Sequence, residues 1–545
     1  MKTSNYSAAL VSGKIFYRGF HGFRGWEPRC FLSVPPVPSV VEFLWLRLIL
    51  CLLLGLTGYS GHAQIQQAWV ARYNNGITNG TNQAVKMALD SAGNIYVTGF
   101  SQNANSNLGY VTIKYAPNGS QLWASRYDST NYPSATPTGL VLDNSNSVII
   151  TGDALTVKYD PNGNQLWTAP YSGTALAVDS SANIYVTGFG TNFNTVKLSP
   201  GGSNVWFATY VDIGPTLSQV ILVDGNTNVY VAGSDTDSSY GQGGVIEGYY
   251  ARLAIVKYDF NGNQLWMAAN SQGGVPISAV QIGGAALDSA NNLYLVADFD
   301  PYIEHYVLFK YSATGTLGWT AFDPGPDAAA DVPHGLALDK FGNVFVTGQS
   351  VYIAPNYAYA TFEYGTYKAN AGGSWVWTNT FPLVPDEASV ATAIAVDSAI
   401  NSYVTGYSPG TNSWNDIVTI KYGPNGNQIW LQRYHGPGNG NDAGNAIAVD
   451  NKGNVYVTGY ETTAAGGTEM VTIKYSPVTL QRRADGTVLL QAQGTNGESF
   501  DFQGSTDLMN WLDLGSVLAD SNGLAQFQDT NASNYNWRFY ITSPQ

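Results

Sequence analysis

Short apolar runs separated by turn residues recur along the chain from residue 84 onward. The first repeat holds Ala88-Leu89-Asp90, then GNIYVTG at 93–99, VTIKY at 111–115, and an Asn-Gly turn before Leu122-Trp123. Runs of about four to eight residues rich in Val, Ile and Tyr are typical of strands, and Asn-Gly is a strong hairpin signal. The pattern predicts four short antiparallel strands in each repeat.

The same pattern returns in eight units, and each unit is anchored by one Asp and one Trp. The acids are Asp90, Asp143, Asp179, Asp224, Asp288, Asp339, Asp397 and Asp450, and the indoles are Trp69, Trp123, Trp167, Trp206, Trp266, Trp319, Trp377 and Trp430. Seven steps from Asp90 to Asp450 give a period of about 51 residues, which is typical of solenoids, propellers and arrays. Four antiparallel strands per unit indicate a propeller blade.

The two ends of the repeat region predict how the ring closes. The last unit stops near Tyr475 without its Trp strand, while WVARY at 69–73 matches WASRY at 123–127. An N-terminal strand that completes the last blade would pair two edges that otherwise invite aggregation. We expect an all-β chain with an eight-bladed β-propeller over 64–475 and a small C-terminal β-rich module over 476–545. Seven blades with one irregular unit are the alternative.

The repeat also resembles a known family. DNKGNVYVTG at 450–459 followed by VTIKY at 471–475 resembles the bacterial β-propeller repeat called SBBP, and the resemblance covers roughly residues 68 to 475. It implies an exported propeller and no defined activity. Two departures stand out: Ala297-Asp298 replaces the usual Thr-Gly, and Glu363 is aligned with the lysine of the other units.

Residues 1–63 have the features of a secretory leader. A basic stretch precedes the apolar run 48–56, and small residues lead to a predicted cleavage after Ala63. About ten uncharged residues are too few to span a bilayer core of ~30 Å, so we expect no membrane span in the mature chain. Cys30 and Cys51 both lie in the leader, which predicts a mature chain without disulfides. The expected location is extracellular, at the cell surface or periplasmic.

Composition and charge narrow the partners. Charged residues make up 11% of the 545-residue chain and aromatic residues 13%, which excludes coiled coils and charge-rich disorder. A formal net charge of -14 argues against nucleic acid, whose binding needs basic patches. A monomer that binds a glycan or a protein is expected.

The repeated charged and aromatic positions are interpreted as structural. A residue found in every blade serves a need common to every blade, so each Asp and the lysine that follows it, such as Asp90 and Lys114, are expected to form an intra-blade staple or a turn cap. The tryptophans are expected to pack between blades.

Function is expected where the repeats differ. Antiparallel alternation puts the first and third turns of each blade on one face and the other connections on the opposite face, which varies in length. The candidate ligand-binding residues on that variable face are Tyr249, Tyr250, Tyr302, His305, His334, Tyr352, Tyr357, Trp414 and His435.

Metal and cofactor binding receive little support from the sequence. The histidines belong to different repeats and lack close spacing, so no metal ligand is predicted. Asp235-Thr236-Asp237 begins like a calcium loop but lacks Gly at its sixth position and Glu at its twelfth, so a solvated loop is expected. No cofactor is predicted, and calcium stays open.

These observations favour an exported, non-enzymatic recognition or surface scaffold that binds a glycan or a protein through the variable face. A polysaccharide-active hydrolase or lyase with acidic residues on the same face is the alternative, because two carboxylates of a propeller can meet in space. A purely structural envelope protein is a third hypothesis. No catalytic residue is predicted.

Overall fold

The computed structural model describes residues 65–212, 216–240, 246–270, 280–299, 307–322, 331–353, 360–381, 388–410, 414–494, 497–506, 510–521, 523–535 and 538–544. Ten antiparallel β-sheets and one 3-10 turn, η2 (Ala532–Asn534), make up the regular structure of these residues. The predicted leader 1–63 lies outside the described residues. None of the described segments forms a helix long and apolar enough to cross a membrane.

Eight of the sheets have four strands. The first four are β2 (Asn82–Leu89), β3 (Ile95–Gln102), β4 (Leu108–Tyr115) and β5 (Gln121–Tyr127); β6 (Pro137–Leu142), β7 (Val148–Gly152), β8 (Thr156–Tyr159) and β9 (Gln165–Ala169); β10 (Ala175–Val178), β11 (Ile184–Thr187), β12 (Phe193–Leu198) and β13 (Asn204–Tyr210); and β14 (Leu217–Val223), β15 (Val229–Tyr240), β16 (Ile246–Tyr258) and β17 (Gln264–Asn270).

The next three are β18 (Gln281–Leu287), β19 (Leu293–Asp298), β20 (Val307–Tyr311) and β21 (Leu317–Phe322); β22 (Val332–Leu338), β23 (Val344–Ile353), β24 (Ala360–Ala369) and β25 (Trp375–Phe381); and β26 (Val390–Val396), β27 (Ser402–Pro409), β28 (Asn415–Tyr422) and β29 (Gln428–Tyr434). The eighth consists of β30 (Ala443–Val449), β31 (Val455–Thr462), β32 (Thr468–Pro477) and the N-terminal strand β1 (Ile65–Tyr73).

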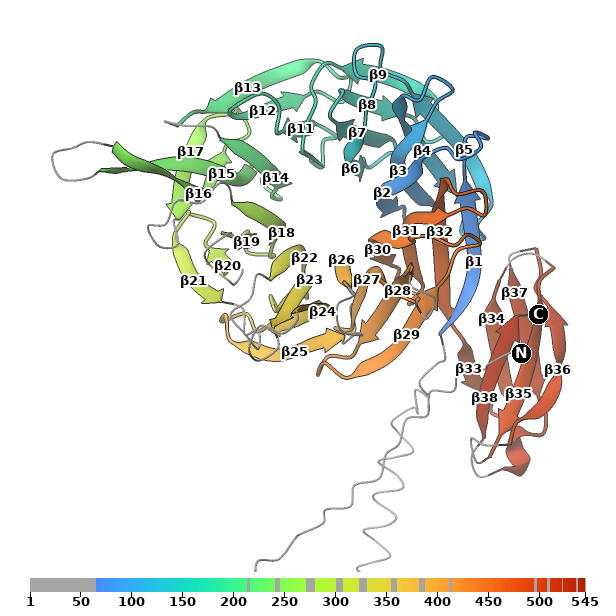
Figure 1. The fold of residues 1–545 in the computed structure, drawn as a ribbon. Coiled ribbons are helices and arrows are strands. Elements are labelled where there is room, and N and C mark those ends of the chain that lie inside the picture. The colour runs from blue at the N-terminus through green and yellow to red at the C-terminus, as the bar shows by residue number, and fades with distance from the viewer. Residues whose placement is uncertain are drawn as a thin grey trace, which may run out of the picture. The chain divides into compact units, whose positions relative to one another are not determined.

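The sheets are arranged in a ring around a central space (Figure 1). The strands of each sheet are called A to D from the inside of the ring outward, so that β1 is strand D of the eighth sheet. The A strands of successive sheets contact one another, and β30 contacts β2, so the ring of contacts is complete. β1 pairs antiparallel with β32 from Ile65 to Tyr73, as the sequence predicts.

Two further sheets follow the repeats. They contain β33 (Thr479–Arg482), β34 (Val488–Gln493) and β37 (Leu524–Asp529), and β35 (Ser499–Ser505), β36 (Leu512–Leu518) and β38 (Phe539–Pro544). Leu490 and Ala525 from one sheet and Phe500 and Phe502 from the other share a buried core. This pair of sheets therefore has a hydrophobic core of its own.

Each repeated Asp caps the turn between strands A and B. In the first sheet, Asp90 Oδ1 accepts the backbone N–H groups of Ala92 and Asn94 at 3.0 and 2.8 Å, and Oδ2 accepts the amide of Asn94 at 2.7 Å. The two backbone bonds recur at all eight acids. An Asp side chain that bonds its own turn in this way stabilises it locally, so the predicted turn cap is confirmed.

The repeated lysine contacts the next sheet rather than only its own. Lys114 Nζ donates to the carbonyl oxygen of Pro161 in the C–D turn of the following sheet at 3.2 Å, and Trp123 Nε1 donates to the same oxygen at 2.9 Å. Seven sheets repeat this arrangement, with lysine distances of 3.0–3.4 Å and tryptophan distances of 2.9–3.2 Å. One carbonyl oxygen thus accepts two donors at each of seven junctions.

Only part of the expected Asp–Lys staple is present. A direct ion pair joins Lys158 to Asp143 at 2.8 Å, and Lys257 lies 3.7 Å from Asp224. Elsewhere the connection passes through an aromatic ring: Lys114 Nζ stands 4.8 Å from the centroid of Tyr96, whose hydroxyl donates to Asp90. The predicted tryptophan packing between blades is confirmed for seven of the eight indoles, because each of these seven lies on the C–D turn glycine of the next sheet, as Trp123 does on Gly163.

The eighth sheet makes the same contact and so closes the ring. Lys474 from β32 and Trp69 from β1 both donate to the Pro117 carbonyl of the first sheet at 3.1 Å. Lys421 and Trp430 have no C–D turn ahead of them, since β32 and β1 are not consecutive in the chain. The junction between the seventh and eighth sheets therefore lacks the shared carbonyl acceptor of the other seven.

The alignment of Glu363 with the repeated lysine is wrong. Lys368 occupies that position, because it pairs with Trp377 and donates to the Pro424 carbonyl at 3.0 Å. Glu363 lies five residues earlier in β24, paired with Ser350. The strands β23 and β24 are each ten residues long. Because β24 begins earlier relative to its lysine than the C strands of most other sheets, Glu363 is aligned with the lysine in the sequence pattern although it lies five residues before it.

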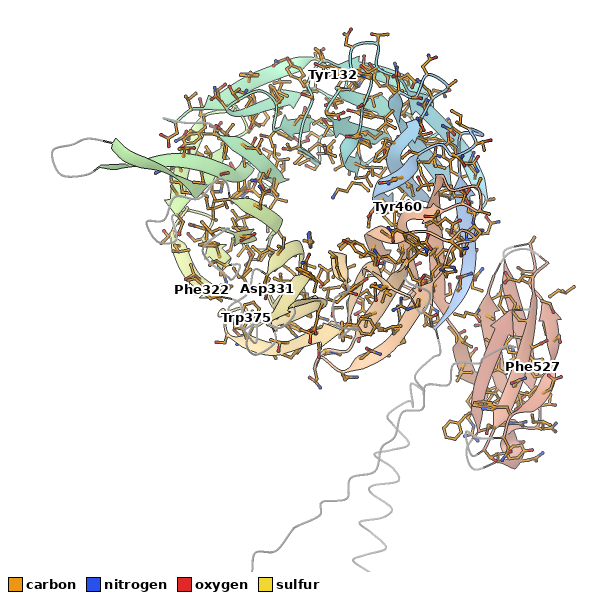
Figure 2. The ribbon with its side chains drawn as sticks, in the orientation of Figure 1. Tyr132, Phe322, Asp331, Trp375, Tyr460 and Phe527 are labelled. Atoms are coloured by element: carbon orange, nitrogen blue, oxygen red, sulfur yellow. The ribbon has the colours of Figure 1, made fainter. Side chains whose placement is uncertain are left out.

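Side chains fill the spaces between neighbouring sheets all round the ring (Figure 2). Among them, the buried Tyr258 and Tyr311 have a pKa raised to about 12 by desolvation, and burial lowers the pKa of Lys474 to about 8. Desolvation also lowers the pKa of Lys197, Lys257, Lys368 and Lys421. The packing between sheets therefore holds titratable groups whose protonation is coupled to folding.

Replacing Trp123 with Phe removes the indole N–H and keeps an aromatic ring. We expect Trp123→Phe to lower the free energy of unfolding by about 1 kcal/mol more than Trp430→Phe, because this is the usual net contribution of one hydrogen bond. Trp430 is the control, since it is partly buried like Trp123 but has no turn ahead of it. Urea denaturation measures both; equal losses would show that the turn carbonyl does not stabilise the ring.

The pH dependence of stability is expected to peak between about pH 9 and 10. Lys474 loses its proton first in the folded state, so the unfolded state binds more protons from about pH 8 to 10.5 and stability rises with pH there. The buried tyrosines keep their protons longer in the folded state, so stability falls above about pH 10. Thermal unfolding at pH 7, 9 and 11 tests this, and a maximum at pH 7 would contradict it.

Candidate functional site on the variable face

The two faces of the ring differ in how uniform their connections are. Every A–B turn has five residues, and so does every C–D turn within the seven sheets that have one, for example 90–94 and 116–120. Among the B–C and D–A connections that the structure describes in full, the length ranges from three residues at 153–155 to nine at 128–136. We call the face that carries the B–C and D–A connections the variable face. The predicted division into a uniform and a variable face is confirmed.

The structure describes only some of the predicted ligand-binding side chains. Tyr302, His305 and Tyr357 lie outside the described residues. Tyr249 and Tyr250 belong to β16 and Tyr352 to β23, and their side chains are not described. Trp414 lies in the B–C connection 410–414 and is 48% exposed, and His435 begins the D–A connection after β29. These last two are therefore on the variable face, as expected.

His334 is not in a connection. It belongs to β22, an A strand, where it hydrogen-bonds to the backbone of Ala391 in the next sheet. Other sheets have Thr138 in β6, Thr174 directly before β10 or Asn445 in β30 at this position, and each donates at 2.6–2.8 Å to a carbonyl in or directly before the A strand of the following sheet. Burial lowers the pKa of the His334 imidazole. The position joins neighbouring sheets, which explains its polar residues better than ligand binding does.

The solvated loop expected around Asp235 is a strand. β15 and β16 continue as a long hairpin that extends outward from the ring (Figure 1). Asp235 is fully buried and bonds Arg252 at 3.0 Å and the Tyr210 hydroxyl at 3.0 Å. Arg252 also pairs with Asp212. Desolvation raises the pKa of Asp235, so this acid is held in a buried network.

A second buried acid lies where β1 meets the last repeat. The Glu461 carboxylate is fully buried and accepts from the Arg72 guanidinium and the Tyr434 hydroxyl. Arg72 also donates to that hydroxyl at 2.6 Å and lies 3.7 Å from Glu469. Burial raises the pKa of Glu461, while its two donors oppose the rise. Arg72 thus neutralises a carboxylate that water does not reach.

The third cluster joins β28, β29 and the connection that follows. Asp416 accepts from Arg433 at 3.1 Å through Oδ2, and its Oδ1 lies 2.8 Å from His435 Nδ1. Asp442 accepts the backbone N–H groups of Gly436 at 2.6 Å and Thr462 at 2.8 Å. Desolvation, and to a smaller extent the neighbouring Asp416, raises the pKa of Asp442. One atom from each of Asp416, His435 and Asp442 lies within 4.8 Å of the others.

The arginines of these clusters were not predicted, although the sequence carries a signal for three of them. Arg72, Arg126 and Arg433 each stand three residues after the Trp of their D strand. Arg126 forms a bidentate pair with Asp128 and also donates to the Ser101 carbonyl at 2.8 Å. The recurrent arginine places a cation at the variable-face end of three D strands.

A Gly-x-Ser-x-Gly pattern at 406–410 (GYSPG) has no nucleophile elbow. Ser408 is fully buried inside β27, and its Oγ accepts from Arg433 Nη2 at 3.0 Å. A nucleophile elbow needs its serine exposed on a strand-to-helix turn. Ser408 instead lies in a strand, where it orients Arg433.

Comparison with known proteins bears on the repeats. Residues 432–460 match the SBBP family, described as a beta-propeller repeat. The chain contains an SBBP β-propeller repeat. This matched segment carries Arg433, His435 and Asp442, and the predicted resemblance is confirmed over these residues. The chain is also 25% identical over 485 residues to an uncharacterized WD repeat-containing protein, L264, of Acanthamoeba polyphaga mimivirus, covering 77% of this chain and 32% of that protein.

Solved structures with some similarity include a protein of unknown function from Dyadobacter fermentans, at 9% identity and a TM-score of 0.37, covering 76% of this chain and 99% of that one. The WD40 domain of SCAP from fission yeast has 7% identity and a TM-score of 0.35, covering 73% and 93%.

Arg72→Met should leave the Glu461 carboxylate buried without its cation. We expect the free energy of unfolding to fall by about 2 kcal/mol at pH 7. This is less than the usual cost of breaking a fully buried ion pair, because the Arg72 side chain is 43% exposed. The loss should shrink towards pH 4, since the raised pKa of Glu461 lets the folded state take up a proton. Chemical denaturation at both pH values measures it.

Arg126→Met is the matched control, because it removes the equivalent arginine from a pair whose acid, Asp128, is 48% exposed. The free energy of unfolding of Arg126→Met should fall by less than about 1 kcal/mol. This loss should not show the pH dependence that protonation of Glu461 gives to Arg72→Met. Equal losses and equal pH dependence in the two variants would contradict the assignment.

Proposed function

We propose that the protein is a non-enzymatic recognition scaffold, which binds a protein or glycan ligand through the variable face. In this proposal residues 64–475 form an eight-bladed propeller, 476–545 form a separate module, and 1–63 direct export of the chain. The scaffold acts as a monomer outside the cytoplasm.

The observation that carries this proposal is the confinement of variation to one face. The A–B and C–D turns share one length because their carbonyl and carboxylate groups are engaged in the same bonds in every sheet. The B–C and D–A connections are free of that requirement and differ from sheet to sheet. Variable connections on a rigid scaffold are where binding sites usually lie.

Exposed groups on the variable face suit recognition. Trp414 is about half exposed in the B–C connection of the seventh sheet, and the His435 side chain is 50% exposed in the D–A connection that follows the same sheet. Aromatic side chains with a polar atom are favoured at binding surfaces because they bury much area at a low entropy cost.

We favour binding over polysaccharide hydrolysis because the described acids of this face are already engaged. Asp235, Glu461 and Asp416 each pair with an arginine, and Asp442 accepts two backbone N–H groups. A glycosidase needs one carboxylic acid free to protonate the leaving group and a second free carboxylate. These four carboxylates have structural partners instead.

The test uses two exposed aromatic residues on opposite faces. Ligands are first selected with the purified protein from a glycan array and from a displayed peptide library. Trp414→Ala should weaken the selected ligands at least about tenfold, because an aromatic anchor at a binding site often contributes more than 1.4 kcal/mol. Phe341→Ala, in an A–B turn on the uniform face, should leave affinity unchanged.

Loss of binding in Phe341→Ala with retention in Trp414→Ala would overturn the face assignment. Release of reducing sugar from any bound glycan would replace the proposal with the hydrolase. Thermal unfolding of both variants checks that neither change disrupts the ring.

A further inference from the structure

We propose that Asp416, His435 and Asp442 bind one zinc ion at the junction between the seventh and eighth sheets. The inference is independent of the recognition function, because it concerns the metal alone. The three residues come from β28 and from the two ends of the D–A connection 435–442.

Zinc suits the donors and their spacing. His435 Nδ1 and Asp416 Oδ1 already face each other at 2.8 Å, and a carboxylate oxygen of Asp442 completes a set within 4.8 Å. Ligand atoms on one zinc lie roughly 3–3.5 Å apart, given bonds of about 2.0–2.2 Å in a tetrahedron. The two acids are buried and fixed, whereas the His435 side chain is 50% exposed. Rotation of the imidazole closes the remaining distance.

The connection that supplies two of the ligands is tightly packed. A Cβ on Gly436 would lie 3.0 Å from both carboxylate oxygens of Asp442, and one on Gly438 would lie 2.3 Å from the Thr463 carbonyl. A Cβ on Gly440 would lie 2.5 Å from the Thr462 side chain. Glycine at these three positions lets the backbone lie directly against the end of β31. The positions of His435 and Asp442 are therefore set before any ion binds, which lowers the cost of binding.

The charge of the cluster also favours a cation. Two buried carboxylates face one arginine, Arg433, which pairs with Asp416 only. Asp442 accepts two backbone N–H groups, and no arginine contacts it among the described residues. Its carboxylate and that of Asp416 have oxygens within 4.8 Å of each other, so the two negative charges repel. A divalent ion between the two carboxylates would offset this repulsion.

The neighbouring junction provides an internal comparison. The seventh junction has Asp416 five residues before the repeated lysine, His435 five residues after the repeated tryptophan, and Asp442 eight residues before the repeated aspartate. The eighth has Glu469, Asn74 and Asn82. There the Asn74 amide donates to Glu469 at 3.0 Å, so an amide satisfies the acid without a metal, while the Asn82 amide oxygen accepts from Ser101 at 2.6 Å. At the seventh junction both amides are replaced by metal-ligating side chains.

The donor set selects the ion. Calcium takes six to eight oxygen ligands, and an imidazole nitrogen with two carboxylates does not provide them. One nitrogen and two oxygens with a solvent-facing side fit zinc with three protein ligands and one water. His435 supplies the exposed side of the site.

The experiment titrates the chelator-treated, purified protein with zinc by calorimetry and repeats it with cobalt, whose visible absorption reports coordination by nitrogen and oxygen. We expect one zinc per chain and a rise in Tm on binding. His435→Asn and Asp442→Asn introduce the residues of the neighbouring junction and should weaken zinc binding at least about 100-fold, since each removes a direct ligand. Both variants should keep the Tm of the metal-free protein.

Glu469→Gln is the matched control, because it changes an acid at the equivalent position of the other junction, and zinc binding should remain. Absence of stoichiometric zinc binding in the unmodified protein would overturn the proposal. Unchanged affinity in His435→Asn would do the same, because it would assign the zinc to other residues. If Asp442→Asn fails to fold, His435→Asn alone decides, since the His435 side chain is half exposed.

Discussion

The ring depends on one shared acceptor at seven of its eight junctions. The carbonyl oxygen of a C–D turn receives a lysine ammonium and an indole N–H from the sheet before it, while the indole face lies on the glycine two residues further along the turn. A carbonyl has two lone pairs, so both donors are satisfied without competition. The same turn must therefore have the same length, a glycine and an accessible carbonyl in each sheet. These requirements account for the conspicuous regularity of the repeat better than any ligand would.

This requirement applies to the turns of the uniform face and leaves the connections of the variable face free to differ. The A–B and C–D turns are fixed by their caps and acceptors, whereas the opposite connections need only return the chain to the next strand. The arginines at the ends of three D strands show what this freedom allows. Each pairs with an acid from a different position: Arg126 with Asp128, Arg433 with Asp416 and Arg72 with Glu461. One repeated cation thus supports three local arrangements, one of which brings a histidine and two buried acids together.

Much of the fold could be predicted from the sequence because it depends on local patterns. Turn chemistry, alternation and period placed the strands, and the Trp motif at both ends predicted the pairing of β1 with β32. The partners of Lys114 could not be predicted, since its acceptor lies 47 residues away in the next repeat. Glu363 was misaligned because β23 and β24 are longer than in other repeats. His334 and Asp235 were assigned to connections because a polar residue in an irregular repeat looks like a loop; in fact both are in strands. The approach of Asp416 to His435 and Asp442 needed the geometry of two adjacent sheets.

The eighth sheet has a consequence for how the chain is made. Its outermost strand is the first to be synthesised, and its partner β32 follows some four hundred residues later along the sequence. Until that partner arrives, β1 has no strand to pair with and the Pro117 carbonyl lacks its lysine donor, Lys474. Contacts this distant in sequence form slowly, and an open edge is exposed to neighbouring chains in the meantime. The interval between the synthesis of β1 and that of β32 is therefore the period in which the chain is most exposed to aggregation.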